Sequence, residues 1–265
     1  MELKKRALIL VSHGSKRTTW LRPFEAIREE TDRELREELG TTVGLSVLEG
    51  LGKTLSEAVH EAVEAGASSI AVFPLFLTAS THLAEDVPEL VGQVREEFGP
   101  ELSIELLTNE PLHTRIWENT RRRLDAHKTD SSTTWIVAPY YGSDRYAAAW
   151  TDLLETASDS VQHWGFAGFT AAPIGHIVGA SPIPTRDAVR AGLTTARSVI
   201  VLPLLLSAGI FQHEKIPAAL ADLQSAERDR VLYTPDGILP DPGIAEWIVT
   251  ETKKWLHPAN GTTSS

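Results

Sequence analysis

The chain has 265 residues and contains no cysteine. This absence excludes disulfides, thiolate metal sites, iron–sulfur clusters and cysteine nucleophiles, so any metal must be held by nitrogen and oxygen atoms. Long apolar runs are also missing near the N-terminus, where the run after Lys4-Lys5-Arg6 lasts only from Ala7 to Val11. That run is too short for a signal peptide or a membrane span, and we expect a cytoplasmic protein.

Basic residues are few, because 25 Lys and Arg stand against 36 Asp and Glu and give a net charge of -11. This balance argues against nucleic acid as a partner, since such binding depends on basic patches that neutralise phosphates. Against this background, Lys16, Arg17 and Arg22 form a local basic cluster. A protein that is acidic overall needs such a cluster to accept an anionic ligand.

Apolar runs and helical patterns alternate along the first half of the chain. This alternation predicts an α/β fold with a parallel sheet flanked by helices. Gly40 is a suitable C-cap for the first helix, and Thr54 with Glu57 forms a capping box for the second. The predicted strands are 7–11, 43–48, 70–73 and 102–106, and the predicted helices are 20–39, 55–65, 84–98 and 112–126.

The second half of the chain repeats the first. Gly14-Ser15 recurs as Gly142-Ser143, Ala65-Gly66 as Ala191-Gly192, and Pro74–Pro88 as Pro203–Pro217, at an offset of about 128 residues. The sequence therefore predicts two homologous α/β domains that face each other across a cleft. We expect domains at 1–127 and 133–257, a polar linker between them, a frayed tail at 258–265, and a monomer because both lobes share one chain.

Three polar residues follow or end predicted strands of the first half: His13, Glu49 and His82. Open α/β sheets place their ligand sites beyond the carboxyl ends of the strands, so these side chains are candidates for one site. A lone histidine is usually structural, but two histidines at equivalent strand ends favour a site, and any metal there would be held by nitrogen and oxygen.

The duplication indicates which residues the fold requires and which it does not. Tyr141 occupies the position of His13 in the second half, and Phe211 occupies the position of His82. Neither imidazole is therefore needed to build the fold, which favours a functional role in the first half. His176 and His213 leave open whether the second half holds a remnant or a different site.

The chain resembles the class II tetrapyrrole chelatases, in particular the long, two-domain CbiX/SirB-type sirohydrochlorin chelatases. The resemblance spans nearly the whole chain. It rests on the strand-His-Gly-Ser start (Leu8 to Ser15), the strand-end Glu49, the Pro-Leu-Phe-Leu loop before His82, and Glu85-Asp86-Val87-Pro88. It implies two chelatase-like domains with the active site in the cleft between them. In that site His13 and His82 bind the incoming divalent metal, and Glu49 assists as ligand or base.

The resemblance further implies a lyase that inserts Co²⁺ or Fe²⁺ into sirohydrochlorin or a related polycarboxylate tetrapyrrole, in cobalamin or sirohaem biosynthesis. The metal is then a substrate, and no organic cofactor is expected. Polar and basic residues near the imidazoles would bind the carboxylates of the tetrapyrrole: Ser15, Lys16, Arg17, Arg22, Lys53, Ser80 and Thr81.

Two other interpretations compete with this one. Ser12-His13-Gly14 is similar to the Arg-His-Gly start of histidine phosphatases, but Ser12 replaces the arginine that would hold phosphate. A non-catalytic metal- or tetrapyrrole-binding protein of the same fold is the second alternative. Measured metal insertion separates it from an enzyme, because a carrier binds without raising the insertion rate.

Overall fold

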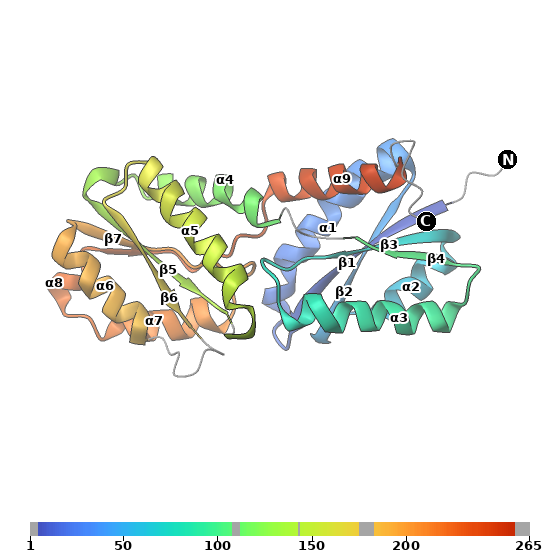
Figure 1. Cartoon of the computed structure of the whole chain (residues 1–265), viewed down its shortest axis with the longest axis horizontal. Coiled ribbons are helices and arrows are strands. Elements are labelled where there is room, and N and C mark those ends of the chain that lie inside the picture. The colour runs from blue at the N-terminus through green and yellow to red at the C-terminus, as the bar shows by residue number, and fades with distance from the viewer. Residues whose placement is uncertain (1–4, 108–111, 143, 175–182, 258–265) are drawn as a thin grey trace. The chain divides into compact units, whose positions relative to one another are not determined.

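The computed structural model describes residues 5–107, 112–142, 144–174 and 183–257 (Figure 1). The chain divides into two compact units. The first unit contains residues 1–76, 81–110 and 239–265, and the second contains residues 77–80 and 111–238. Within the described residues, no helix combines the length and apolar character needed to cross a bilayer.

The first unit is a parallel sheet with the strand order β2-β1-β3-β4. Predicted and observed elements agree closely, and both the Gly40 C-cap and the Thr54–Glu57 capping box are present. The elements are β1 (Lys5–Ser15), α1 (Thr18–Leu39), β2 (Thr42–Gly50), α2 (Leu55–Glu64), β3 (Ala67–Pro74), a π-helix (His82–Asp86), α3 (Val87–Phe98), β4 (Ser103–Leu106) and, from the end of the chain, α9 (Pro242–Leu256).

The second unit has the equivalent strand order, β6-β5-β7-β8, again all parallel. This match supports the predicted duplication. Its elements are α4 (Leu112–Asp125), two short 3₁₀ turns (Ser131–Thr133 and Asp144–Tyr146), β5 (Thr134–Tyr140), α5 (Ala147–His163), β6 (Gly168–Pro173), α6 (Ile183–Thr195), β7 (Ser198–Val201), a π-helix (Phe211–Lys215), α7 (Ile216–Ala221), α8 (Ser225–Arg228) and β8 (Val231–Tyr233).

Two helices belong to a different unit from the one in which the predicted domain boundaries place them. Helix α4 lies in 1–127, yet its Arg123 donates hydrogen bonds to Pro203 O and Asp236 O of the second unit. Helix α9 lies in 133–257, yet it runs beside α1 of the first unit (Figure 1). Each helix buries its apolar side against a surface that matches it. The position of the helix in the sequence does not decide which unit provides that surface.

The C-terminal helix is an integral part of the first unit. Trp247 of α9 is buried and packs edge-on against Phe73 of β3, with ring centroids 5.1 Å apart. Lys253 pairs with Glu38 of α1 at 2.5 Å, and the Trp255 indole N–H donates to Glu105 at 2.7 Å. Burial of the large indole contributes most here, because ion pairs at an exposed surface are worth little.

Strands β1 and β2 run further than their apolar residues predict. The predicted strands end at Val11 and Leu48, whereas pairing continues to the pairs Gly14↔Glu49 and Ser15↔Gly50. Gly14 has φ of +95°, and a Cβ atom there would lie 1.8 Å from Glu49 O. Because Gly14 has no side chain, the two strand ends can approach each other closely.

We predict that Gly14→Ala loosens the ends of β1 and β2. The added methyl must displace the Glu49 backbone and occupy a disfavoured φ, at a cost of about 2–4 kcal/mol. Hydrogen exchange of the β1 and β2 amides measures this loss as a lower opening free energy.

Gly92→Ala is the matched control, because nothing lies within 4 Å of a Cβ at this α3 position. That variant should keep or raise stability, by up to about 1 kcal/mol. Equal exchange protection in the Gly14→Ala variant and the unmodified protein would contradict the steric account.

Candidate functional site

His13 lies within β1, two residues before the strand ends at Ser15. This corrects the expectation that it follows the strand. Gly14, the next residue of β1, pairs with Glu49 of β2. This pairing brings Glu49 beside His13, and His13 Nδ1 lies 3.5 Å from Glu49 Oε1. The His13 side chain is 43% exposed and that of Glu49 is 69% exposed, so both remain open to a ligand.

His82 is the first residue of a π-helix and does not lie in a loop as expected. The helix follows β3 and continues directly into α3. The His82 ring meets the His13 ring edge-on, with centroids 4.5 Å apart and planes at 85°. On its other side the ring stacks near Phe76, at 6.1 Å and 29°. The structure thus brings together the three residues that the sequence proposes as one site.

These three side chains are neighbours, but they do not form a closed cage. Within the described parts of the chain, no group of three or more His, Asp or Glu side chains is arranged as a ready-made metal site. Two imidazoles in contact, with a carboxylate at the exposed rim, form an open donor set. Such a set suits a metal that has to leave again, since full coordination would retain it.

The hydrogen-bond partners indicate where the imidazole protons lie. His13 Nδ1 is 3.1 Å from Gly14 O, which can only accept. His82 Nδ1 is 2.6 Å from Asp86 Oδ2, a carboxylate oxygen that accepts. In the neutral rings each Nδ1 therefore carries the hydrogen, and each Nε2 presents a lone pair. A lone pair is what a metal ligand or a proton acceptor requires.

Sequence reasoning did not assign Asp86 to the site and used it only as part of the Glu85-Asp86-Val87-Pro88 segment. The available signal was the spacing of four residues from His82, which places two side chains on one side of a helical turn. The interaction of these two residues is the shortest contact made by either imidazole.

The residues proposed to bind substrate carboxylates lie around the same strand and helix ends. Lys16, Arg17 and Arg22 are exposed between β1 and the first turns of α1, and Ser15 Oγ accepts a hydrogen bond from Arg17 N. Ser80 and Thr81 are half-buried residues immediately before the π-helix. Lys53 differs from the others, because its ammonium group pairs with Glu61 of α2 at 2.5 Å.

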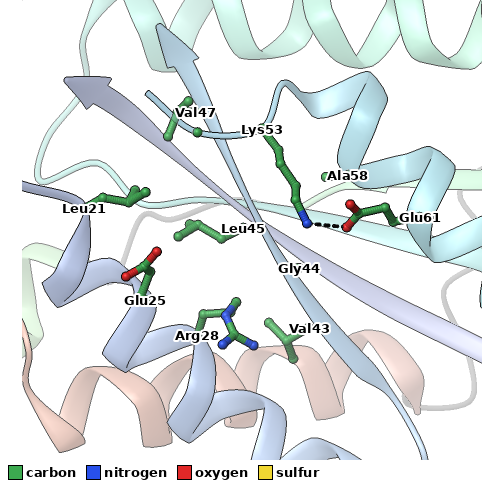
Figure 2. Close-up of a pocket in the computed structure, with 11 residues that line it drawn as sticks. Leu21, Glu25, Arg28, Val43, Gly44, Leu45, Val47, Lys53, Ala58 and Glu61 are labelled. Carbon is green, nitrogen blue, oxygen red and sulfur yellow. Dashed lines mark hydrogen bonds and ion pairs between the residues drawn. The ribbon is translucent and has the colours of Figure 1, made fainter. Parts of the chain in front are cut away.

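Lys53 and Glu61 line a pocket of about 370 Å³ on the edge strand β2, between α1 and α2 (Figure 2). Glu25 and Arg28 add one charge of each sign. Its lining includes none of His13, Glu49 and His82, and its charges balance. This pocket is therefore separate from the imidazole site and has no excess positive charge for a polyanion.

The second unit fills the corresponding positions with packed aromatic rings. Tyr141 and Phe211 lie 5.1 Å apart, where the first unit has its two imidazoles. Partial burial raises the pKa of Tyr141, so its hydroxyl stays neutral at physiological pH. His213 is exposed in the second π-helix, and His176 lies outside the described residues. Tyr141 and Phe211 thus pack against each other where the first unit has its two partly exposed imidazoles.

Ser12 also bears on the phosphatase interpretation. Its side chain is fully buried in β1. A residue that replaces a phosphate-binding arginine would have to face the ligand, so this position offers no phosphate site.

Comparison with known proteins identifies the family of the chain. A model of the CbiX family matches residues 7–126, which contain His13, Glu49 and His82. Sirohydrochlorin cobaltochelatase from Saccharolobus islandicus (strain L.S.2.15) is 33% identical over 110 residues, 40% of this chain and 80% of that protein. Sirohydrochlorin ferrochelatase from Priestia megaterium is 28% identical over 169 residues, 63% of this chain and 61% of that protein.

The match thus spans less than two thirds of the P. megaterium relative. The fold likeness is more extensive. The solved structure of SirB from Bacillus subtilis with Fe3+ has a TM-score of 0.73 at 18% identity and covers 97% of this chain and 98% of that one. This likeness confirms the predicted fold of two α/β domains. Together with the family and cobaltochelatase matches, it shows that the chain belongs to the CbiX/SirB-type family of class II tetrapyrrole chelatases.

Proposed function

We propose that the protein inserts a divalent metal, Co²⁺ or Fe²⁺, into sirohydrochlorin or a related polycarboxylate tetrapyrrole, as a step toward cobalamin or sirohaem. The observation that carries the proposal is the contact of His13 with His82, both with Nε2 lone pairs available, beside Glu49. The similarity to the S. islandicus cobaltochelatase and the P. megaterium ferrochelatase supports it.

The reaction has a simple balance. A divalent cation enters the macrocycle, and two pyrrole N–H groups each lose a proton. The site must therefore hold the cation loosely and accept protons, and imidazole and carboxylate groups do both near neutral pH. His13 and His82 would bind the cation through Nε2. Glu49, the most exposed of the three, would balance its charge or take a proton.

The substrate is a polyanion, whereas the protein has a net charge of -11. Local positive charge is needed to offset this repulsion. Lys16, Arg17 and Arg22 lie exposed directly after the strand that carries His13. We assign them to the tetrapyrrole carboxylates, with hydrogen bonds from Ser15, Ser80 and Thr81.

Anaerobic assays with purified protein test the proposal. Sirohydrochlorin and either Co²⁺ or Fe²⁺ are mixed with and without protein, and the absorbance of the metallated product is followed, with protoporphyrin as the comparison substrate. An enzyme raises the insertion rate at substoichiometric concentration. A carrier binds metal or tetrapyrrole and leaves the rate at its uncatalysed value, which would contradict the proposal.

We predict that His13→Ala and His82→Ala each lower the insertion rate by about 10²-fold or more, because each removes a metal ligand and proton acceptor. The melting temperature should change little, since the second unit builds equivalent elements with Tyr141 and Phe211. His213→Ala removes an exposed imidazole from the second π-helix and should retain full activity. Near-normal rates in either site variant would place the chemistry elsewhere.

We predict that neutralising Lys16 and Arg17 together, as Lys16→Gln with Arg17→Gln, raises KM for the tetrapyrrole more than it lowers kcat. Binding of distant carboxylates is shared by the ground and transition states, so it appears mainly in KM. The unmodified protein should lose affinity with added salt, because exposed ion pairs are screened over about 10 Å at 0.1 M.

Arg33→Gln is the control, since it removes an exposed cation later in α1. It should leave KM and the salt response unchanged. A Lys16 and Arg17 double variant with the same KM and the same salt response as the unmodified protein would remove these two residues from the binding site.

A further inference from the structure

The strongest unassigned feature of the site is the interaction between His82 and Asp86. Asp86 Oδ2 lies 2.6 Å from His82 Nδ1, and both side chains belong to one five-residue π-helix. The Asp86 side chain is 42% exposed and that of His82 is 37% exposed. The contact is therefore a short, charge-assisted hydrogen bond at the rim of the site, where it limits rotation of the imidazole.

The second unit shows what the π-helix needs and what it does not. At the offset that aligns Pro74 with Pro203, the π-helix Phe211–Lys215 repeats His82–Asp86. In each, the backbone N–H of the residue after the π-helix donates to the carbonyl of its first residue, His82 or Phe211. The same backbone turn thus forms with neither an imidazole nor a carboxylate at these two positions.

The carboxylate and the imidazole are replaced together. Phe211 stands at the position of His82, and Lys215 stands at the position of Asp86. Their neighbours keep their character, since Glu214 repeats Glu85 and Pro217 repeats Pro88. Within this chain, a carboxylate at the fifth position of the π-helix therefore occurs together with the imidazole at the first position. The π-helix itself forms without it.

A general helix-start role does not account for Asp86. Acidic residues favour the first turn of a helix because of its dipole, whereas a lysine is unfavourable there. The second unit tolerates Lys215 at this position and keeps its acid at Glu214. The dipole is already served by Glu85 and Glu89 in the first unit. Asp86 is thus available for a contact specific to His82.

We propose that Asp86 is a positioning residue that holds His82 in its Nδ1–H form and directs Nε2 toward the incoming metal. This rests on the proposed function, in which His82 binds the metal substrate. Carboxylates that accept from the second nitrogen of a metal-binding imidazole fix its tautomer and raise its basicity. Asp86 acts through His82 and does not itself touch the substrate.

The experiment compares Asp86→Ala, which removes the acceptor, with Asp86→Asn, which keeps an acceptor oxygen and removes the charge. Nitrogen-15 NMR of metal-free protein reports which ring nitrogen of His82 carries the hydrogen. Calorimetry with CoCl₂ alone reports metal affinity. In Asp86→Ala, His82 should shift toward the Nε2–H form, and Co²⁺ affinity should fall about 10- to 100-fold.

Asp86→Asn should restore the Nδ1–H form and much of the affinity. Glu89→Gln is the matched control, because it removes a carboxylate from the first turn of α3 that accepts a hydrogen bond from Gln93 Nε2. It should change neither readout. An Asp86→Ala protein with an unchanged His82 tautomer and unchanged Co²⁺ affinity would overturn the proposal.

A folding defect would not hide the answer. If Asp86→Ala did not fold, Asp86→Lys would replace it, since the second π-helix folds with Lys215 at this position. The tautomer readout uses no metal and no tetrapyrrole, so it decides the role of Asp86 even if the protein inserts no metal. If the unmodified protein inserted metal and Asp86→Ala changed neither the tautomer nor the affinity, the positioning role would be wrong and the proposed function would stand.

Discussion

The close approach of β1 and β2 beyond their apolar residues is the constraint on which the site depends. Gly14 and Glu49 pair directly, and only a residue without a side chain fits at Gly14. This pairing fixes the backbone on both sides of His13 and places Glu49 within 3.5 Å of its ring. His82 then arrives from the π-helix after β3 and completes the set.

Duplication provides the main control on function. Both units build a four-stranded parallel sheet of the same strand order and both insert a π-helix before the helix that follows the third strand, within the residues described. The fold therefore needs these elements. Among the described residues, two imidazoles are in contact in the first unit, whereas Tyr141 and Phe211 pack together at these positions in the second. The imidazoles are thus not required by the fold that the two units share, and this is the basis for assigning them a function.

Much of the fold could be predicted because its signals are local. Apolar runs, the Gly40 cap and the Thr54 capping box each depend on a few adjacent residues, and the structure has them where expected. The grouping of His13, Glu49 and His82 could be predicted from the shared edge of a parallel sheet. Their roles as ligands and bases stay predictions.

The remaining features depend on contacts between distant parts of the chain. Helix α4 belongs to the second unit and α9 to the first because their apolar sides fit surfaces there. The residues of either helix, taken alone, do not predict this placement. The extension of β1 to Ser15 follows from space at Gly14, which sequence alone cannot distinguish from a turn. The π-helix at His82 widens a turn by one residue, and Asp86 gains its role only through that turn.

The central claim is that His13 and His82 together bind the metal substrate. X-ray absorption spectroscopy of the Co²⁺-loaded protein tests it most directly, because scattering from imidazole rings is distinct from that of water and carboxylate. The account predicts two imidazole ligands in the unmodified protein and none in the His13→Ala and His82→Ala double variant. Imidazole ligation that persists in the double variant, or that is absent from the unmodified protein, would contradict it.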